Sequence, residues 1–493
     1  MYYKSTLDVK VKVKPVGCSF LHHTSYEGVC RTGSPEQLTL DYDRAVGFDE
    51  YEKFLAHCEE LKEAGAELLP PSYIPIYDDF RMSRETIDSI GDGLRPWDPV
   101  VFSGLLSQHL LTKFAMRYPN PVSMFDPWHV DGTSFLHSIG RPCHGAYEIG
   151  EVKKWVELLR VKKALGYMRV LNVEKGGLLK VGLKSSIYDL VDLEKRFGIE
   201  FVTVNSEEVL ELFDRMETDH PDWVEEARDR TKELISGAEK VCMSEEYVLR
   251  SVMFYVVIKK LLEKYECNAF SMPCREVCAG GTLMGRKMVF CLAHSLLKDE
   301  GIVTSCEGDL SALMATAVLM NLTRKAPHMG NNLLDNRAQK VCVVHHDVPC
   351  THMKGFGSPA LPYAIAPFTV AGWGASLRYD FSRSVGEDIT LLKFDPAGKK
   401  MMAIRGRITE GDKYTSLTEG AMHAALAGDL AEDSDSHTKP GCSLTVKYCV
   451  NDIDRLTEIQ KEYGHHFALV FGDHIGDLRE LAPVLGIGID TVE

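Results

Sequence analysis

Three carboxylates follow two short apolar segments, and their positions suggest a site for a hard divalent cation. Glu307 and Asp309 stand on either side of a glycine in "TSCEGDLSALM", where a predicted strand, 302–306, runs into a predicted helix, 310–322. Glu276 follows another predicted strand in "NAFSMPCREVC". Carboxylates combined with one imidazole are ligands that suit Mn²⁺ or Mg²⁺. The sequence therefore predicts that an oxygen-rich cation site can form where these two strands end.

Each carboxylate also has a simpler interpretation. Asp309 occupies the N-cap position of the predicted helix, where an aspartate commonly accepts backbone N–H bonds and does nothing else. Glu276 could be an ordinary surface glutamate. The location favours a functional role, because ligands of open α/β sheets gather at the carboxyl ends of the strands. Two carboxylates from successive strand ends can face each other across such a pocket.

Several histidines could supply the imidazole: His345 and His346 in "VCVVHHDVPC", His352, and His465 and His466 in "EYGHHFALVFGDH". Each pair follows or opens an apolar strand, so at least one member of each pair is expected to be structural. A lone histidine more often packs or makes a structural hydrogen bond than binds a ligand. Spacing alone does not choose between the two pairs.

The elements that must position these residues fall into three regions, since 493 residues are too many for one hydrophobic core. Strand and helix patterns alternate over 1–165 and again over 166–344, which predicts two Rossmann-like α/β domains with parallel sheets. Over 345–493 short strands separated by turns predict a β-rich domain, which ends in a final helix and strand. The carboxylates belong to the second region and the histidines mostly to the third.

Composition and charge exclude several classes of protein. The formal charge of -15 leaves no basic face for nucleic acid or for an anionic membrane. Residues 7–13 alternate apolar and polar, which predicts a half-exposed strand and not a secretion signal. The glycine-rich pieces lack the spacing of a dinucleotide site, so no nucleotide cofactor is expected. We expect a cytoplasmic protein with a small-molecule substrate.

Fourteen cysteines are scattered through apolar segments, which indicates buried free thiols. Cys274 and Cys278 in "PCREVCAGG" are spaced as zinc ligands could be on one helical turn. No second close pair follows at zinc-site spacing. A zinc protein built on this pair would lose its metal on Cys→Ser changes and keep it in Glu276→Gln.

Three segments together resemble the superfamily of L-fucose isomerase and L-arabinose isomerase, which are metal-dependent sugar isomerases: "CREVCAGG", "SCEGDLSALM" and "GHHFALVFGDHIGDLRELAPVLGI". Carried over residue by residue, the resemblance implies that Glu276 and Asp309 are the catalytic, metal-binding carboxylates and that His466 is the imidazole ligand. It implies substrate contacts for His465 and His346. Glu307 has no settled role in that superfamily, and we group it with these two as a candidate for substrate binding or for support of the site.

The resemblance also implies a reaction and an assembly. The expected reaction converts an open-chain aldose into a ketose through a cis-enediol, with either carboxylate as base and the other as acid, and with Mn²⁺, Mg²⁺ or Co²⁺ as cofactor. Manganese is the first expectation. The expected assembly is a homo-oligomer, a trimer or hexamer. Fucose, arabinose, another deoxy sugar and a charged sugar all remain open as substrates, and so does a sugar-binding or regulatory protein that has lost catalysis.

Overall fold

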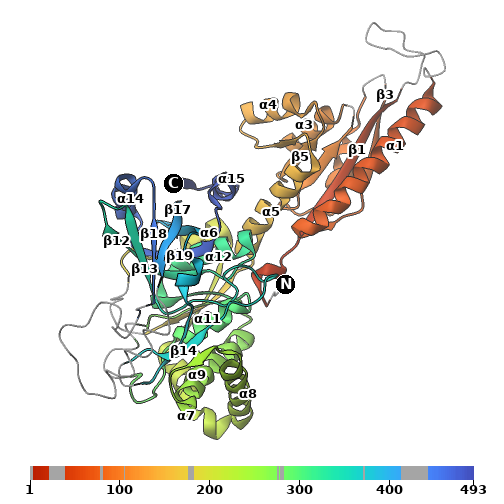
Figure 1. Ribbon diagram of the computed structural model, residues 1–493. Helices are drawn as coiled ribbons and strands as arrows, with labels where there is room; N and C mark the ends of the chain where they lie inside the picture. The colour runs from red at the N-terminus through yellow and green to blue at the C-terminus, as the bar shows by residue number, and fades with distance from the viewer. Residues whose placement is uncertain are drawn as a thin grey trace. The chain divides into compact units, whose positions relative to one another are not determined.

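The computed structural model describes residues 4–21, 39–77, 81–104, 106–175, 183–274, 277, 282–369, 372–411, 442 and 444–493. The chain forms two compact units (Figure 1). The smaller is Val9–Lys163, and the larger combines Met1–Asp8 with Ala164–Glu493. No helix in the described parts of the chain is long and apolar enough to cross a membrane.

The smaller unit is built around a parallel sheet with the strand order β2-β1-β4-β5-β6, in which β3 also pairs with β1. Its strands are β1 (Val11–Leu21), β2 (Ala66–Leu68), β3 (Ser72–Tyr77), β4 (Val100–Ser103), β5 (Val122–Phe125) and β6 (His144–Ala146). Its helices are α1 (Leu40–Glu59), α2 (Arg84–Gly91), α3 (Ser107–Arg117), α4 (His129–Ser138) and α5 (Ile149–Gly166), whose last turn enters the larger unit.

Helices cover both faces of this sheet because alternate residues of a strand point to opposite sides. Val11 and Val13 of β1 pack in one cluster with residues of α1 and α5. Val16 and Cys18 pack in another cluster with residues of α2 and α3. The predicted strand therefore exists, but it begins at Val11 and continues to Leu21, with its lysines exposed only near the start.

The larger unit contains a second parallel sheet, with the order β11-β10-β7-β8. Its strands are β7 (Arg169–Glu174), β8 (Glu200–Asn205), β10 (Ala269–Ser271) and β11 (Val303–Ser305). The helices of this region are α6 (Leu190–Phe197), α7 (Ser206–Asp219), α8 (Pro221–Gly237), α9 (Glu245–Lys264), α11 (Cys291–Asp299) and α12 (Leu310–Thr323). A small sheet of β9 (Lys240–Val241), β14 (Ala364–Pro367) and β15 (Ala375–Arg378) joins the same core.

A closed antiparallel barrel follows. Its strands are β12 (His328–Asn336), β13 (Val341–His345), β16 (Asp388–Phe394), β17 (Lys400–Gly411), β18 (Thr445–Cys449) and β19 (His466–Phe471). The barrel closes because β16 pairs with both β17 and β19. The final elements are α14 (Ile453–Ile459), α15 (Ile475–Leu485) and β20 (Gly488–Val492), which lies parallel to β17.

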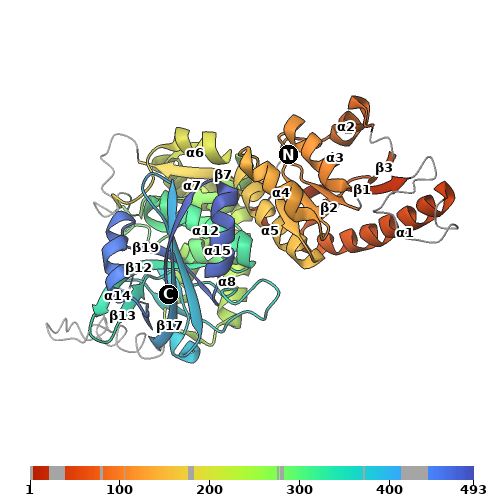
Figure 2. The ribbon, with the colours of Figure 1, turned by 90° about the horizontal axis from the view of Figure 1, so that it is seen from above.

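The observed order, parallel sheets with helices and then a β-rich region, confirms the predicted fold class. The barrel takes β12, and all of β13 except its last residue, from residues that precede 345. Helix α12 packs against β16 and β19, so the parallel sheet and the barrel meet along this helix (Figures 1 and 2).

Tyr448 of β18 is a large, fully buried side chain of the barrel, and its ring lies against a glycine of the neighbouring strand β17. A Cβ atom at Gly406 of β17 would lie 2.2 Å from the Tyr448 ring. The Tyr448 hydroxyl donates a hydrogen bond of 2.7 Å to the side-chain oxygen of Asn332 on β12. The ring is therefore held between three strands and cannot move away without losing this bond.

We predict that Gly406→Ala lowers the free energy of unfolding by about 1–3 kcal/mol, because overpacking a filled core costs about that much. Urea denaturation of the full chain measures the change. Gly476→Ala in α15 is the matched control, since its Cβ would meet no atom within 4 Å. A helical alanine there should stabilise by about 0.5–1 kcal/mol. Equal stability of Gly406→Ala and the unmodified protein would contradict the packing described.

Candidate active site

The two strand ends that carry the predicted carboxylates are neighbours. Ser271 of β10 pairs with Ser305 of β11, and the Gly308 N–H donates a 3.0 Å hydrogen bond to the Met272 carbonyl. A short 3-10 turn, Cys306–Gly308, then leads into α12, so Asp309 lies directly after a strand end as predicted. Glu276 lies outside the described residues.

Asp309 is fully buried and its carboxylate has three partners. Oδ1 accepts the Ala312 N–H at 3.1 Å, which confirms the predicted helix cap. Oδ2 accepts a 2.6 Å hydrogen bond from the Lys393 ammonium and lies 3.0 Å from Nδ1 of His466. Lys393 and His466 are also fully buried. The structure therefore brings together two candidate residues, Asp309 and His466, with a lysine that the sequence interpretation missed.

Lys393 comes from β16, in the segment "DITLLKF". It is a single basic residue among apolar ones, and its neighbours Leu392 and Phe394 are buried as well. A lysine in the middle of an apolar strand is almost never fully buried unless it is paired. The sequence therefore indicates that Lys393 has a charged partner, but it does not identify Asp309 as that partner.

Burial and charge act in opposite directions in this cluster. Burial raises the pKa of Asp309, but Lys393 and His466 oppose it more strongly, and the resulting pKa is about 2. Burial lowers the pKa of His466 to about 4 in spite of the Asp309 carboxylate. Burial also lowers the pKa of Lys393, and Asp309 opposes that shift. The cluster is thus a buried ion pair of Lys393 and Asp309 with the His466 imidazole beside it.

The hydrogen bonds assign the ring protons of two histidines. Nδ1 of His466 faces a carboxylate oxygen and so carries the proton, which leaves the lone pair on Nε2. Nδ1 of His346 accepts the Asp347 N–H at 3.1 Å, so its proton is on Nε2. The two rings stack with centroids 5.3 Å apart. In the described part of the chain, neither Nε2 atom has a hydrogen-bond partner.

Glu307 adjoins the second ring, with its Oε1 3.8 Å from Nε2 of His346. Its backbone has φ 59° and ψ 16°, the left-handed region that a non-glycine residue seldom adopts. The Glu307 side chain is only 5% exposed. Such strained residues cluster at functional sites. The geometry directs this carboxylate inward beside His346 and does not leave it at the surface.

A second buried ion pair supports the segment that carries His346. The Arg378 guanidinium donates to both oxygens of Asp347, at 2.6 and 2.8 Å. The Leu444 N–H donates to Oδ1 of the same carboxylate at 2.9 Å. A bidentate arginine–carboxylate pair fixes the orientation of both side chains and also balances their charges. Sequence reasoning missed this pair because its members are 31 positions apart and only the fold brings them together.

The remaining candidate histidines have other surroundings. His465 is half-buried just before β19, and its carbonyl accepts the Asn332 N–H. Nδ1 of His352 lies 3.3 Å from an oxygen of Asp299, whose carboxylate raises the His352 pKa. The structure thus selects one histidine from each predicted pair, His346 and His466, and brings their rings into contact.

The chemistry of these donors fits a divalent cation. Carboxylates and neutral imidazoles are the ligand types such ions take, and Nε2 of His466, which carries the lone pair, is buried without a hydrogen-bond partner among the described residues. Among the described residues alone, no three His, Cys, Asp or Glu side chains converge as ligands of one ion. The cysteines among these residues form no disulfide bond.

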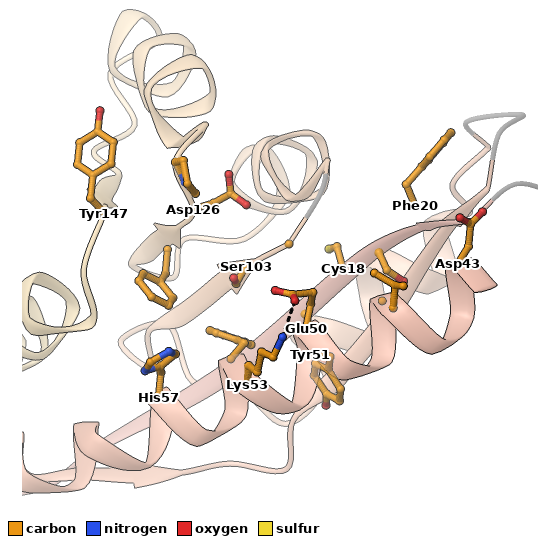
Figure 3. A pocket seen from close by; sticks show the side chains of 18 of the residues that line it. Cys18, Phe20, Asp43, Glu50, Tyr51, Lys53, His57, Ser103, Asp126 and Tyr147 are labelled. Carbon is orange, nitrogen blue, oxygen red and sulfur yellow. Dashed lines mark hydrogen bonds and ion pairs between the residues drawn. The ribbon is translucent and has the colours of Figure 1, made fainter. Parts of the chain in front are cut away.

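A cavity of about 520 Å³ lies elsewhere, in the smaller unit (Figure 3). It is formed at the carboxyl ends of β1, β4 and β5 and is flanked by α1. Lys53 of α1 points toward it and donates a 2.9 Å hydrogen bond to Glu50. Of the candidate residues that the structure describes, none lines this cavity.

Comparison with known proteins relates the chain to sugar isomerases. No protein-family model matches the sequence. Two curated proteins described as sulfoquinovose isomerase, from Priestia aryabhattai and Priestia megaterium, are each 23% identical to this chain over 358 residues. The matched part is 72% of this chain and 70% of each relative. This distant likeness confirms the expectation of an isomerase enzyme in carbohydrate metabolism, and it leaves the choice of sugar open.

The fully buried His294 of α11 makes stability depend on pH. Its ring stacks on Phe270, and neither of its nitrogens has a hydrogen-bond partner in the described structure. Burial holds its pKa well below the usual value. Below pH 6.5 the unfolded chain therefore binds a proton on this residue that the folded chain does not. Stability must fall as the pH is lowered through this range, by up to about 1.4 kcal/mol per pH unit for one such group.

We predict that His294→Leu flattens this loss of stability between pH 6.5 and pH 5. Urea denaturation at several pH values measures the slope for the unmodified chain and the variant. His57→Gln is the control, because the His57 side chain is 51% exposed and already reaches water in the folded state. Identical slopes for His294→Leu and the unmodified chain would contradict the prediction.

Proposed function

We propose that this protein is a metal-dependent aldose–ketose isomerase that acts on an open-chain sugar through a cis-enediol. The observation that carries the proposal is the buried Asp309–His466 contact at the end of β11, with the His346 ring stacked beside it. The similarity to sugar isomerases supports the same reaction class.

The reaction needs no oxidant. A carboxylate removes the proton from C2 of the aldose, and the electron pair forms the C1–C2 double bond of the enediol. The proton then goes to C1, and the hydroxyl proton of O2 is transferred to O1. The C1 aldehyde thus becomes an alcohol while the C2 alcohol becomes a ketone, and atoms and electrons balance.

The residues proposed to hold the cation are Glu276 and His466, with His346 and Glu307 beside His466. Asp309, which the resemblance also implied as a ligand, faces Nδ1 of His466 and therefore lies across that ring from Nε2. Mn²⁺ is the first candidate and Mg²⁺ or Co²⁺ the alternatives. When bound, the ion would supply Lewis-acid polarisation of the sugar oxygens. A neutral imidazole with its lone pair on Nε2, as at His466, is the form in which histidine binds a metal.

The charges around Asp309 suggest that Asp309 and Glu276 have different roles. A general base works best when its pKa is close to the operating pH. Asp309, with a pKa of about 2 and an ammonium on Oδ2, is a weak base. We therefore assign proton transfer at C2 to Glu276, and assign to Asp309 the orientation of His466. Glu307 supports His346.

The proposed substrate is a sugar whose natural identity the test must find. Sulfoquinovose, named in both relatives, is the charged sugar to try first. Fucose, arabinose and other deoxy sugars complete the panel. We further propose a cytoplasmic homo-oligomer, a trimer or hexamer, in keeping with the superfamily that the sequence resembles.

We predict that the purified protein, stripped of metal and supplied with Mn²⁺, Mg²⁺ or Co²⁺, interconverts an aldose and its ketose. Glu276→Gln should lower the rate at least about 100-fold, the scale of a lost acid–base group. Asp309→Asn should lower it about 10- to 100-fold, the scale for a carboxylate that orients a metal-binding histidine. Chromatographic separation of aldose and ketose measures the conversion. Glu67→Gln in the smaller unit is the control, because its side chain is 53% exposed and should leave the rate unchanged.

Two outcomes would reject this function. One is an absence of turnover of any sugar in the panel with all three metals. The other is full activity in Glu276→Gln and Asp309→Asn. Sugar binding without turnover would favour the alternative, a binding or regulatory protein on the same scaffold.

A further inference from the structure

We propose that Lys393 is a positioning residue for His466 and acts through Asp309. The Lys393 ammonium and the His466 imidazole share a single oxygen, Oδ2 of Asp309, at 2.6 and 3.0 Å. This inference deepens the proposed function, because it explains how His466 would present Nε2 to the site. The contact of both groups with Oδ2 is seen in the structure and does not depend on the proposed function.

Burial makes the lysine necessary. Asp309, Lys393 and His466 all have 0% exposure, and a buried carboxylate without a charged partner is costly. The other contact of Asp309, the Ala312 N–H, fixes Oδ1 at the start of α12. Lys393 supplies the full positive charge that allows the second oxygen to remain ionised in this enclosed place.

The three residues come from three elements that pack together. β16 carries Lys393, and β19 begins with His466. These strands pair, with Leu392 opposite Ala468. α12 packs against both strands and carries Asp309 at its cap. Lys393 therefore stands on the strand next to the histidine, where it can set the position of Oδ2 but makes no recorded bond to the ring.

The position of Oδ2 decides the form of the imidazole. An ionised oxygen facing Nδ1 requires the proton on that nitrogen and leaves the lone pair on Nε2. Carboxylates that accept the N–H of a metal-binding histidine commonly fix its tautomer and ring orientation. Without the ammonium, one partner of Oδ2 is lost, and both the carboxylate and the ring gain freedom to turn.

The alternative is that Lys393 only balances a buried charge. The two roles differ in one observable, the tautomer of His466 in metal-free protein. Nitrogen-15 NMR of histidine-labelled protein distinguishes a ring protonated on Nδ1 from a ring that exchanges between tautomers. The His466→Gln variant assigns the signal, because that variant lacks it.

We expect the unmodified protein and Lys393→Arg to show one fixed tautomer, protonated on Nδ1. Lys393→Met should show averaged nitrogen signals. Lys393→Leu should also lose the fixed form, and it serves if Lys393→Met does not fold. A fixed Nδ1–H tautomer in either of these two variants would overturn the proposal.

Lys298→Met is the matched control. Lys298 is equally buried, but its ammonium donates to the carbonyls of Pro327 and Val348 and not to a carboxylate. Its removal should lower stability and leave the His466 tautomer fixed. Loss of the tautomer in this variant as well would mean that any buried lysine has this effect, which would also overturn the proposal.

A second measurement separates this inference from the proposed function. Titration calorimetry of metal-free protein with Mn²⁺ should show at least tenfold weaker binding for Lys393→Met, with recovery in Lys393→Arg. If the tautomer changes as expected but the unmodified protein neither binds Mn²⁺ nor isomerises sugars, the positioning role stands and the proposed function fails. If Lys393→Met changes the tautomer of His466 but leaves the Mn²⁺ affinity unchanged, the positioning of His466 by Lys393 does not contribute to metal binding, and that part of the proposal is rejected.

Discussion

The contact between Asp309, Lys393 and His466 is the interaction on which the rest of the site depends. One carboxylate caps α12 with one oxygen and receives an ammonium and an imidazole on the other. All three side chains are closed off from water, so none of them could remain charged or oriented without the others. The parallel sheet supplies the carboxylate, and the barrel supplies the lysine and the histidine. The buried charges of the site therefore lie where the parallel sheet and the barrel meet.

The closed barrel explains why that joint is rigid. β16 pairs on both sides, so the strand that carries Lys393 has no free edge. β19, which carries His466, lies between β16 and β12. A side chain at such a position has little freedom to adjust. A rigid support for a donor group is what a binding or catalytic site requires, because small errors in its position weaken function.

The sequence predicted the elements better than the partners. The strand and helix around "TSCEGDLSALM" and the cap at Asp309 follow from apolar runs and a polar residue at a boundary, which are local signals. Lys393 gave only a local anomaly, a charge in an apolar strand. Its partner is 84 positions away, and the closure of the barrel determines that contact. Spacing alone did not choose within either histidine pair, since each histidine has a neighbour of the same type. The resemblance named His466, and the fold brings the ring of His346 against it.

The buried charges near the site are balanced in pairs, and this limits what each carboxylate can contribute. Asp347 is neutralised by Arg378, and Asp309 by Lys393. A carboxylate that already has a cation in direct contact attracts a second cation less strongly. Asp309 therefore contributes direction more than charge. Under the proposed function, most of the negative charge that holds a divalent ion would have to come from carboxylates such as Glu276 and Glu307. The strained backbone of Glu307 then has a physical reason, because the left-handed turn is what directs this carboxylate inward beside His346.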